Sequence, residues 1–223
     1  MADALFRRFT RLTDIDCTIE PGSRSDLDQL ARFHYAAGRP GPIARLLRAV
    51  DDGQTIGVLV ASMPTLNGRW RAIAWPGGYD TLDQRLNANR LNHDVRILSR
   101  VIVDPRYRGR GIAVKLVRAY LADPCTVRTE AVAAMAHACP FFERAGMWRI
   151  DLPPSKADAK LRRAMARHGV EPADLLSHPP ESIAGALRSW ARARKLRGGD
   201  IAGRAFAALT HPPVALVHDR SAS

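Results

Sequence analysis

A short loop between an expected strand and an expected helix carries the clearest chemistry in this 223-residue sequence. A β-branched run ends at Asp104-Pro105, and the segment from Ile112 to Ala122 reads as an amphipathic helix. A loop of this kind points backbone N–H groups, and the positive end of a helix dipole, at one spot. The sequence therefore predicts an anion site suited to a pyrophosphate. Its basic and small residues are Arg106, Arg108, Gly109, Arg110 and Gly111.

The spacing of this loop separates it from two common nucleotide-binding motifs. No Gly-Lys-Ser/Thr follows, as a P-loop requires, and Ala113 and Val114 stand where a Rossmann loop continues to its third glycine. On the physical argument alone, any nucleotide would fit. The competing interpretation is a solvated basic turn without a ligand.

Two motifs resemble those of a known family. Arg106-x-x-Gly109-x-Gly111 resembles the Q/R-x-x-G-x-G/A signature of the GNAT acyltransferases, and it follows the fourth expected strand, as in that family. Pro140 to Met147, PFFERAGM, resembles the second landmark, an aromatic-containing helix that ends in glycine. The resemblance covers residues 13 to about 152. It implies an α/β GNAT fold, with a mixed sheet that is splayed between its fourth and fifth strands and flanked by helices.

The same resemblance implies acetyl-CoA, or another acyl-CoA, as the cofactor. In the family, the loop amides hold the pyrophosphate, the end of the fourth strand binds the pantetheine arm, and the thioester lies where the strands separate. The implied cofactor-binding residues are Val101, Ile102, Val103, Arg106, Arg108, Gly109, Arg110, Gly111, Ile112 and Ala113.

Three segments are similar to narrower groups within this family. FHYAAGRP (33–40), LSRVIVDPRYRGRGIAVKLV (98–117) and TEAVAAMAHACPFFERAGM (129–147) resemble GNAT-like domains associated with ABC-type ATPases and the phage Mom DNA-modification proteins. This resemblance implies a nucleic-acid base as acceptor, with the exocyclic amine of adenine and DNA favoured over RNA. It also implies an ABC-type ATPase partner, and a transferred group that need not be acetyl.

Acyl transfer to an amine requires groups that remove a proton from the amine and return one to the thiolate. Glu130 follows the signature helix on the next expected strand, His34 and Tyr35 end the first helix, and Ser99 lies on the fourth strand. These four are the candidate catalytic residues. Each also has a structural interpretation: a carboxylate paired with an arginine, a capping His beside a core Tyr, and a hydrogen-bonded strand serine.

One position departs from the family pattern. Many GNAT enzymes place a Tyr in the second landmark helix as general acid, and Phe141 and Phe142 stand there instead. The proton would come from Tyr35, Tyr79 or water, or catalysis has been lost. Cys139 could carry an acyl group, although a structural thiol is the commoner interpretation. No His, Cys or carboxylate cluster has local metal-ligand spacing.

The charge of the chain favours an anionic partner. The sequence has 34 Lys and Arg against 22 Asp and Glu, a net charge of +12 with a pI near 10.7. An arginine-rich proteome encoded by a GC-rich genome is the alternative explanation. Aromatic residues among arginines suit base stacking, and a basic helical face suits phosphates, although tryptophans can also pack a loop onto the core. The expected nucleic-acid-binding residues are Arg69, Trp70, Arg71, Trp75, Arg85, Arg90, and Arg188, Arg192 and Lys195 on one face of a helix over 180–196.

Composition and patterning give the expected organisation. We expect a GNAT-like domain over 1–152, with an aperiodic insertion at 64–95, and a basic, mostly helical extension over 153–223. No run of 18 apolar residues indicates a membrane span, the N-terminus does not resemble a secretory signal, and three dispersed cysteines favour the cytoplasm.

Three functional hypotheses follow. The first is acyl-CoA-dependent modification of a nucleic-acid base. The second is N-acetylation of a small-molecule or protein amine, and the third is a nucleic-acid-binding relic without catalysis. The sequence leaves the oligomeric state open.

Overall fold

The computed structural model describes residues 16–34, 38–177, 179–196 and 198–222. The chain divides into two compact units, which we call the sheet unit (1–150 and 215–223) and the helical unit (151–214). The sequence-based division placed the last strand in the extension. In the structure that strand, from Ala215 onward, belongs to the sheet unit, because its apolar residues Ala215 to Val217 are buried and pair with another strand of the sheet.

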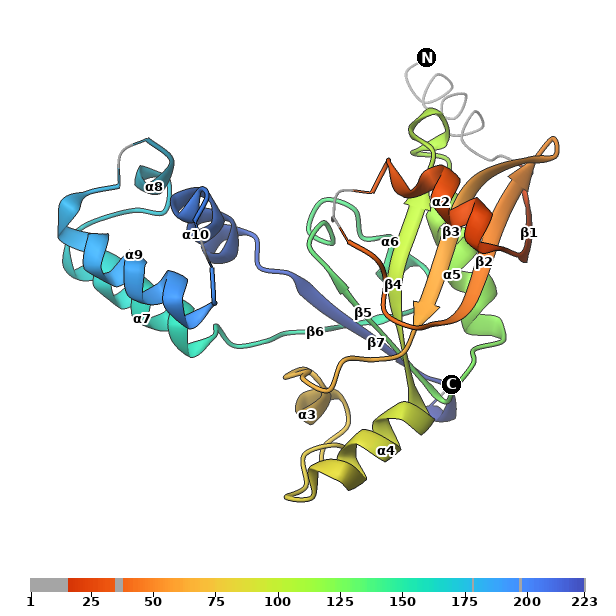
Figure 1. Ribbon diagram of the computed structural model, residues 1–223, viewed down its shortest axis with the longest axis horizontal. Helices are drawn as coiled ribbons and strands as arrows, with labels where there is room; N and C mark the ends of the chain where they lie inside the picture. Colours follow the sequence, from red (N-terminus) through yellow and green to blue (C-terminus); the bar gives the residue numbers. More distant parts are fainter. Residues whose placement is uncertain (1–15, 35–37, 178, 197, 223) are drawn as a thin grey trace, which may run out of the picture. The chain divides into compact units, whose positions relative to one another are not determined.

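The sheet unit is built on seven strands in the order β1-β2-β3-β4-β5-β7-β6 (Figure 1). The first four are antiparallel neighbours, whereas β4 and β5 run parallel. This mixed sheet with a parallel central pair confirms the predicted architecture. The strands are β1 (Thr18–Pro21), β2 (Ile43–Asp51), β3 (Gln54–Ser62), β4 (Val95–Val103), β5 (Arg128–Ala133), β6 (Trp148–Ile150) and β7 (Val214–Asp219).

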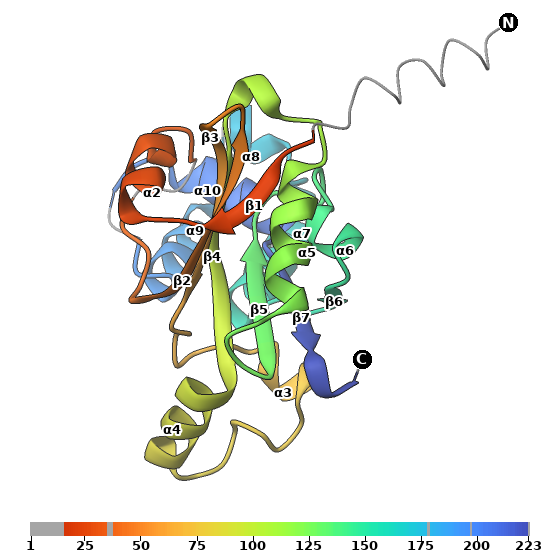
Figure 2. The same cartoon turned by 90° about the vertical axis from the view of Figure 1, so that its right-hand side faces the viewer.

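Helices α2 (Arg24–Ala31) and α5 (Ile112–Ala122) cover opposite faces of this sheet (Figure 2). Leu27 and Leu30 of α2 pack with Val58, Val60 and Ile102. On the other face, a Cβ added to Gly57 would lie 3.1 Å from the Ile112 side chain and 3.2 Å from that of Leu116, so α5 lies directly on the strand. The alternation of side chains along β3 thus supplies both helices with a buried surface.

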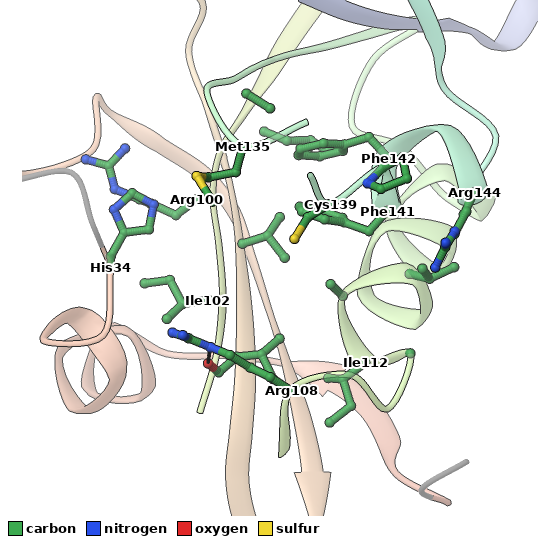
Figure 3. A pocket seen from close by; sticks show the side chains of 18 of the residues that line it. His34, Arg100, Ile102, Arg108, Ile112, Met135, Cys139, Phe141, Phe142 and Arg144 are labelled. Atoms are coloured by element: carbon green, nitrogen blue, oxygen red, sulfur yellow. Dashed lines mark hydrogen bonds between the residues drawn. The ribbon is translucent and has the colours of Figure 1, made fainter. Parts of the chain in front are cut away.

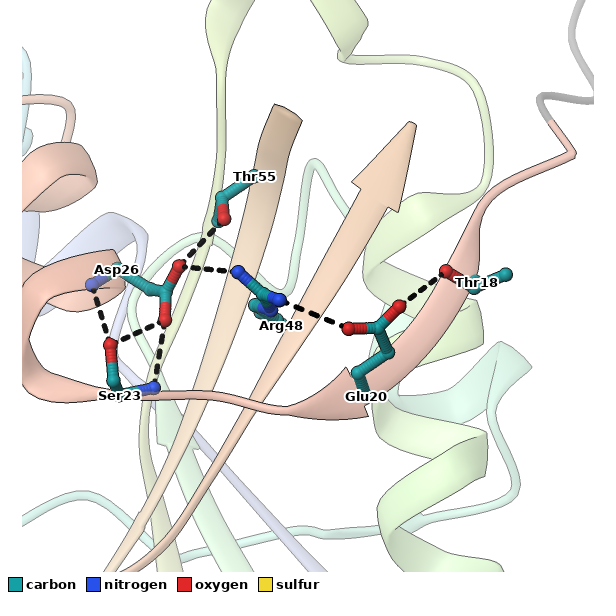
Figure 4. A network of polar contacts seen from close by, with 6 residues as sticks. All are labelled: Thr18, Glu20, Ser23, Asp26, Arg48 and Thr55. Carbon is teal, nitrogen blue, oxygen red and sulfur yellow. Dashed lines mark hydrogen bonds and ion pairs between the residues drawn. The ribbon is translucent and has the colours of Figure 1, made fainter. Parts of the chain in front are cut away.

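A capping box begins helix α2. The helix starts at Arg24, and Ser23 is the N-cap residue that exchanges hydrogen bonds with Asp26 (Figure 4). Burial alone would raise the pKa of Asp26. Hydrogen bonds from Ser23, Thr55 and Arg48 outweigh burial and hold that pKa well below its usual range.

The segment expected to be an aperiodic insertion contains two helices, α3 (Arg71–Ala74) and α4 (Gln84–Asp94). Asp83 caps α4, its carboxylate accepting hydrogen bonds from the backbone of Arg85 and Leu86. The sequence predicted neither helix, because α3 has four residues, too few to show a period, and α4 has Leu91 as its buried residue. The segment packs through Trp75 and Leu91, which share a cluster with Val95 and Val217.

The helical unit has its own core, formed by α7 (Lys156–Arg167), α8 (Asp174–Ser177), α9 (Glu181–Ala193) and α10 (Ile201–Thr210). Within it, the Asp158 carboxylate accepts hydrogen bonds from Trp190, Arg194 and Ser155. Burial alone would raise the pKa of Asp158. The hydrogen bonds from these donors outweigh burial, and the pKa lies below its usual value. Among the described helices of both units, none has the length and apolarity that a membrane crossing needs.

Candidate active site

A cavity opens where the central parallel strands separate. The pairing of β4 with β5 covers Val95 to Ile97 opposite Arg128 to Glu130, and a cavity of about 540 Å³ is lined by the part of β4 beyond it. This volume is typical of small-molecule sites. The described lining residues are Phe33, His34, Leu98, Ser99, Arg100, Val101, Ile102, Val103, Tyr107, Arg108, Gly109, Gly111, Ile112, Ala113, Val114, Val132, Ala133, Met135, Ala138, Cys139, Pro140, Phe141, Phe142 and Arg144.

A β-bulge shapes the wall of this cavity. In the β3–β4 register, Val60 pairs with Arg100 and Ala61 with Leu98, so Ser99 is the extra residue. The Ser99 hydroxyl donates to the Val60 carbonyl at 3.2 Å and lies 2.7 Å from the Ser62 hydroxyl. Ser99 therefore matches the structural interpretation, a hydrogen-bonded strand serine, although it also lines the cavity.

The glycine loop presents an open backbone to one end of the cavity. Gly109 and Gly111 have φ of 78° and 77°, which side chains rarely adopt, and a Cβ added to either would meet nothing within 4 Å. Gly111 is the N-cap of α5 and supplies no capping side chain. The first N–H groups of an α-helix lack intrahelical partners, so those of Ile112 and Ala113 suit an anion.

The three arginines of this loop have different roles. The Arg106 guanidinium pairs with Asp104 at 2.9 Å and 3.1 Å, and these hydrogen bonds lower the pKa of Asp104. The Arg108 side chain donates to the Val103 and Phe33 carbonyls. Arg110 lies over the Tyr107 ring, 5.8 Å from its centroid. Arg106 thus fixes the loop, and Arg108 is the arginine of the loop that lines the cavity.

Glu130 is held as a structural carboxylate, not as an accessible base. Its side chain is 0 % exposed, and its oxygens accept from Arg71 Nη2 at 2.5 Å, Arg71 Nε at 2.8 Å and Trp70 Nε1 at 2.7 Å. It is absent from the described cavity lining. We therefore correct the prediction that Glu130 is a catalytic base, because both of its carboxylate oxygens accept hydrogen bonds from the buried Arg71 or the indole of Trp70.

His34 follows the end of α2 at Ala31 by three residues and lies on the wall of the cavity. Figure 3 shows His34 and Arg100 on one side of the cavity and Phe141, Phe142 and Arg144 on the other. Tyr35, the neighbouring candidate, lies outside the described residues. Arg100 and Arg144 were missed by sequence reasoning; the signals available were the position of Arg100 on the fourth strand and that of Arg144 within the second landmark.

The second landmark forms helix α6 (Phe141–Arg144), and Gly146 follows it with φ of 105°. The rings of Phe141 and Phe142 lie at the cavity wall with centroids 4.3 Å apart and are tilted by 32° to one another. Cys139 is exposed and lines the cavity, so a buried structural thiol is not what the structure contains. Tyr79 instead hydrogen-bonds Asp94 and Arg128, away from the cavity lining.

Three of the residues expected to contact nucleic acid are held inside the fold. Arg71 is 3 % exposed and Trp75 is 7 % exposed, while the half-buried Trp70 donates its indole N–H to Glu130. The Arg128 guanidinium lies over the Trp75 ring at 5.1 Å. These side chains stabilise the insertion, which corrects their assignment as a stacking surface. Arg69, Arg85 and Arg90 are exposed, and their role stays a prediction.

The expected basic face of the long helix in the helical unit is shorter than predicted. Arg188 and Arg192 are exposed on α9, but the helix ends at Ala193. Lys195 lies beyond the end with φ of 54°, so it does not continue the helical face. A nucleic-acid contact by these three residues stays a prediction.

The charge of the cavity is one-sided. Its described lining contains His34, Arg100, Arg108 and Arg144 but no Asp or Glu. Such a wall attracts anions and disfavours a protonated alkylamine. No group of three or more metal-ligating side chains occurs within the part of the chain that the structure describes.

Comparison with known proteins gives a family match. Residues 9–147 match the model of the Acetyltransferase (GNAT) family, which is more than half of the chain. A search among curated proteins gave no match.

Several solved structures resemble the chain at low identity. The aminoglycoside acetyltransferase AAC(6')-Ib with paromomycin and acetyl-CoA has 17% identity and a TM-score of 0.41, covering 64% of this chain and 88% of that one. N-acetylglutamate synthase from Neisseria gonorrhoeae, with coenzyme A and N-acetyl-glutamate, has 11% identity and a TM-score of 0.42, covering 92% and 35%. A GNAT family acetyltransferase from Elizabethkingia anophelis with acetyl-CoA bound has 11% identity and a TM-score of 0.36, covering 61% of this chain and 78% of that one. Likenesses of this size carry no argument about the acceptor.

Proposed function

Because the chain belongs to the acetyltransferase (GNAT) family, we propose that it uses acyl-CoA to acylate an amine of a nucleic-acid base. The observation that carries the choice of acceptor is the basic cavity, whose described lining contains no carboxylate. The exocyclic amine of a base is uncharged at neutral pH and belongs to a polyanion. A lysine or polyamine would instead bring positive charge to a positive wall.

The residues of the cavity fit an acyl-CoA. The open backbone of Gly109 and Gly111, with the N-terminus of α5, suits a pyrophosphate, and Arg108 and Arg144 add positive charge. The backbone of Val101 and Val103 lies beyond the β4–β5 pairing and lines the same cavity, so it can bind an extended amide-bearing arm. When bound, acyl-CoA would supply an acyl group activated as a thioester.

His34 is the side chain best placed to take a proton from the acceptor. It is the imidazole of the described lining, and an imidazole accepts a proton near neutral pH. Glu130 cannot share this role because it is paired with Arg71. On the opposite wall, the apolar Phe141 and Phe142 limit the access of water to the place where the strands separate.

The finer features of the resemblance remain proposals. The net charge of +12 and the exposed Arg85, Arg90, Arg188 and Arg192 support DNA or RNA as the macromolecule that carries the acceptor. A stacked base is out of reach of a cavity, so the substrate would be single-stranded or flipped. Adenine in DNA as the target, an ABC-type ATPase partner and a cytoplasmic location are predictions from the sequence.

The test is mass spectrometry of nucleosides. In the first experiment, DNA and RNA from bacteria that express the chain are digested to nucleosides. In the second, DNA and RNA are incubated with purified protein and acetyl-CoA before they are digested. The Gly111→Glu variant, which blocks the anion site, and the Gly77→Glu variant, with a similar φ outside the site, serve as a matched pair. We expect a new nucleoside with the unmodified chain and with Gly77→Glu only.

Two outcomes would count against the proposal. If acetyl-CoA binds but no new nucleoside forms in either experiment, the acceptor is wrong, and small-molecule and protein amines become the substrates to screen. If acyl-CoA does not bind at all, acyl transfer itself is wrong, and a salt-dependent affinity for DNA would then favour a binding protein without catalysis.

A further inference from the structure

Among the described residues Arg100 has no carboxylate partner, although several other arginines of the protein are bound to carboxylates. Arg71 and Arg128 are bound to Glu130 and Asp219, and Arg194 to Asp158. Arg100, also half-buried, instead donates to two carbonyl oxygens, that of Ser99 at 2.7 Å and that of Gly38 at 3.3 Å. A guanidinium has more donors than these two bonds use, so part of its fork is available to a ligand.

The position of Arg100 separates it from the anion site of the glycine loop. Arg100 pairs with Val60 on β3, whereas Val103, which accepts from Arg108, pairs with Gly57. Three residues of strand correspond to about 10 Å, so the two positive groups mark different stretches of β4. Arg100 and His34 lie on the same side of the cavity (Figure 3).

We infer that Arg100 forms an oxyanion-binding subsite at the acceptor end of the cavity, so that the acceptor carries a phosphate or carboxylate near its reacting amine. The inference rests on the proposed acyl transfer, which assigns the glycine-loop end to the cofactor and the His34 end to the acceptor. The two carbonyls fix the guanidinium before the ligand arrives, which reduces the entropy that binding must overcome. The fork geometry of arginine matches both phosphate and carboxylate.

The two sources of the oxyanion can be separated with matched probes. Adenosine 5'-monophosphate and adenosine differ by a phosphate, and alanine and alaninamide differ by a carboxylate charge. Dissociation constants are measured by NMR titration of the full-length protein saturated with coenzyme A. A charge-assisted hydrogen bond corresponds to about 10- to 100-fold in affinity, so we expect the anionic member of one pair to bind tighter by that factor.

Variants on the same strand test whether Arg100 is responsible. Arg100→Gln should bring the two members of the preferred pair within about twofold. Arg100→Lys keeps the charge but loses the fork, and an intermediate preference is expected. Arg96→Gln is the matched control, because Arg96 lies on β4 outside the described cavity lining and its guanidinium donates to the Asn92 and Val95 carbonyls.

The outcomes distinguish this inference from the proposed function. If adenosine 5'-monophosphate binds more tightly than adenosine, the acceptor is nucleotide-like. If alanine binds more tightly than alaninamide, the acceptor is amino-acid-like. No preference in either pair, a preference that survives Arg100→Gln, or an equal loss in Arg96→Gln would overturn the subsite. The failure of the proposed function is separate: coenzyme A would not bind, or no acceptor would be acylated, whatever the probes show at Arg100.

Discussion

The glycine loop (104–111) and the insertion (64–95) both combine arginine with aromatic residues, yet the structure uses them in opposite ways. In the glycine loop, Arg110 lies over Tyr107, and Arg108 faces the cavity. In the insertion, Arg71 is 3 % exposed and bound to Glu130 of β5.

The difference lies in the carboxylates that each region meets. Asp104 is the acidic residue bound within the glycine loop, and it occupies Arg106 alone. The insertion meets Glu130 on β5, and Trp75 packs beneath Arg128, which is itself bound to Asp219 on β7. Arginine and aromatic residues that are close in a sequence therefore predict a binding surface only where no carboxylate from a distant part of the chain binds the arginines.

The largest expected effect comes from breaking the buried pair of the insertion. Glu130→Gln leaves the Arg71 charge buried without its counterion, and we expect the free energy of unfolding to fall by about 3–5 kcal/mol. Chemical denaturation measures the change.

A double variant sharpens this result. Arg71→Met with Glu130→Leu removes both charges and should recover much of the lost stability, because no unpaired ion remains. If Glu130→Gln were as stable as the unmodified chain, the insertion would not depend on this ion pair. The proposed difference between the insertion and the glycine loop would then be wrong.

The next effect concerns the open backbone of the glycine loop. Gly111→Glu places a carboxylate at the N-terminus of α5 and strains a φ of 77°, so we expect coenzyme A affinity to fall by about 100-fold or more. Calorimetry of coenzyme A binding measures this. Gly77→Glu in the insertion, with φ of 72° and no neighbour within 4 Å of an added Cβ, should leave affinity unchanged. Equal losses in both variants would show that the effect is strain alone.

The smallest effect is a pH dependence of the glycine loop. Hydrogen bonds from Arg106 lower the pKa of Asp104, so its contribution to stability is fully present above the pKa of an unfolded aspartate, about 3.9, and is lost as pH falls through the lower folded value. We expect the stability difference between the unmodified chain and Asp104→Asn to be constant from pH 7 to about pH 5 and to shrink below about pH 4. Thermal unfolding at each pH measures it. A difference that grows at acid pH would contradict the assignment.

Local sequence signals predicted the elements whose ends are marked by glycine or proline nearby in the sequence. The bounds of α5 agree with the expected ones because Gly111 precedes the helix and Asp123-Pro124 follows it. The glycine loop was predictable for the same reason, since its conformation depends on its own residues.

Long-range partners account for most of what the sequence did not predict. Glu130 was a plausible base until Arg71, 59 positions earlier, proved to be its partner. Helix α4 has Leu91 as its buried residue, so its period was too weak to detect. Arg100 and Arg144 lie on opposite walls of one cavity, a relation that depends on how β4 and α6 are placed.

The helical unit lies in the chain between two strands that are neighbours in the sheet. Ile150, at the end of β6, pairs with Ala215, at the start of β7. A segment of 64 residues thus leaves and re-enters the sheet at facing positions, where a tight turn would join the same two strands into a plain hairpin. The helical unit therefore has the topology of an insertion in one loop. During evolution it could be gained, lost or exchanged there without any change in the strand order of the sheet.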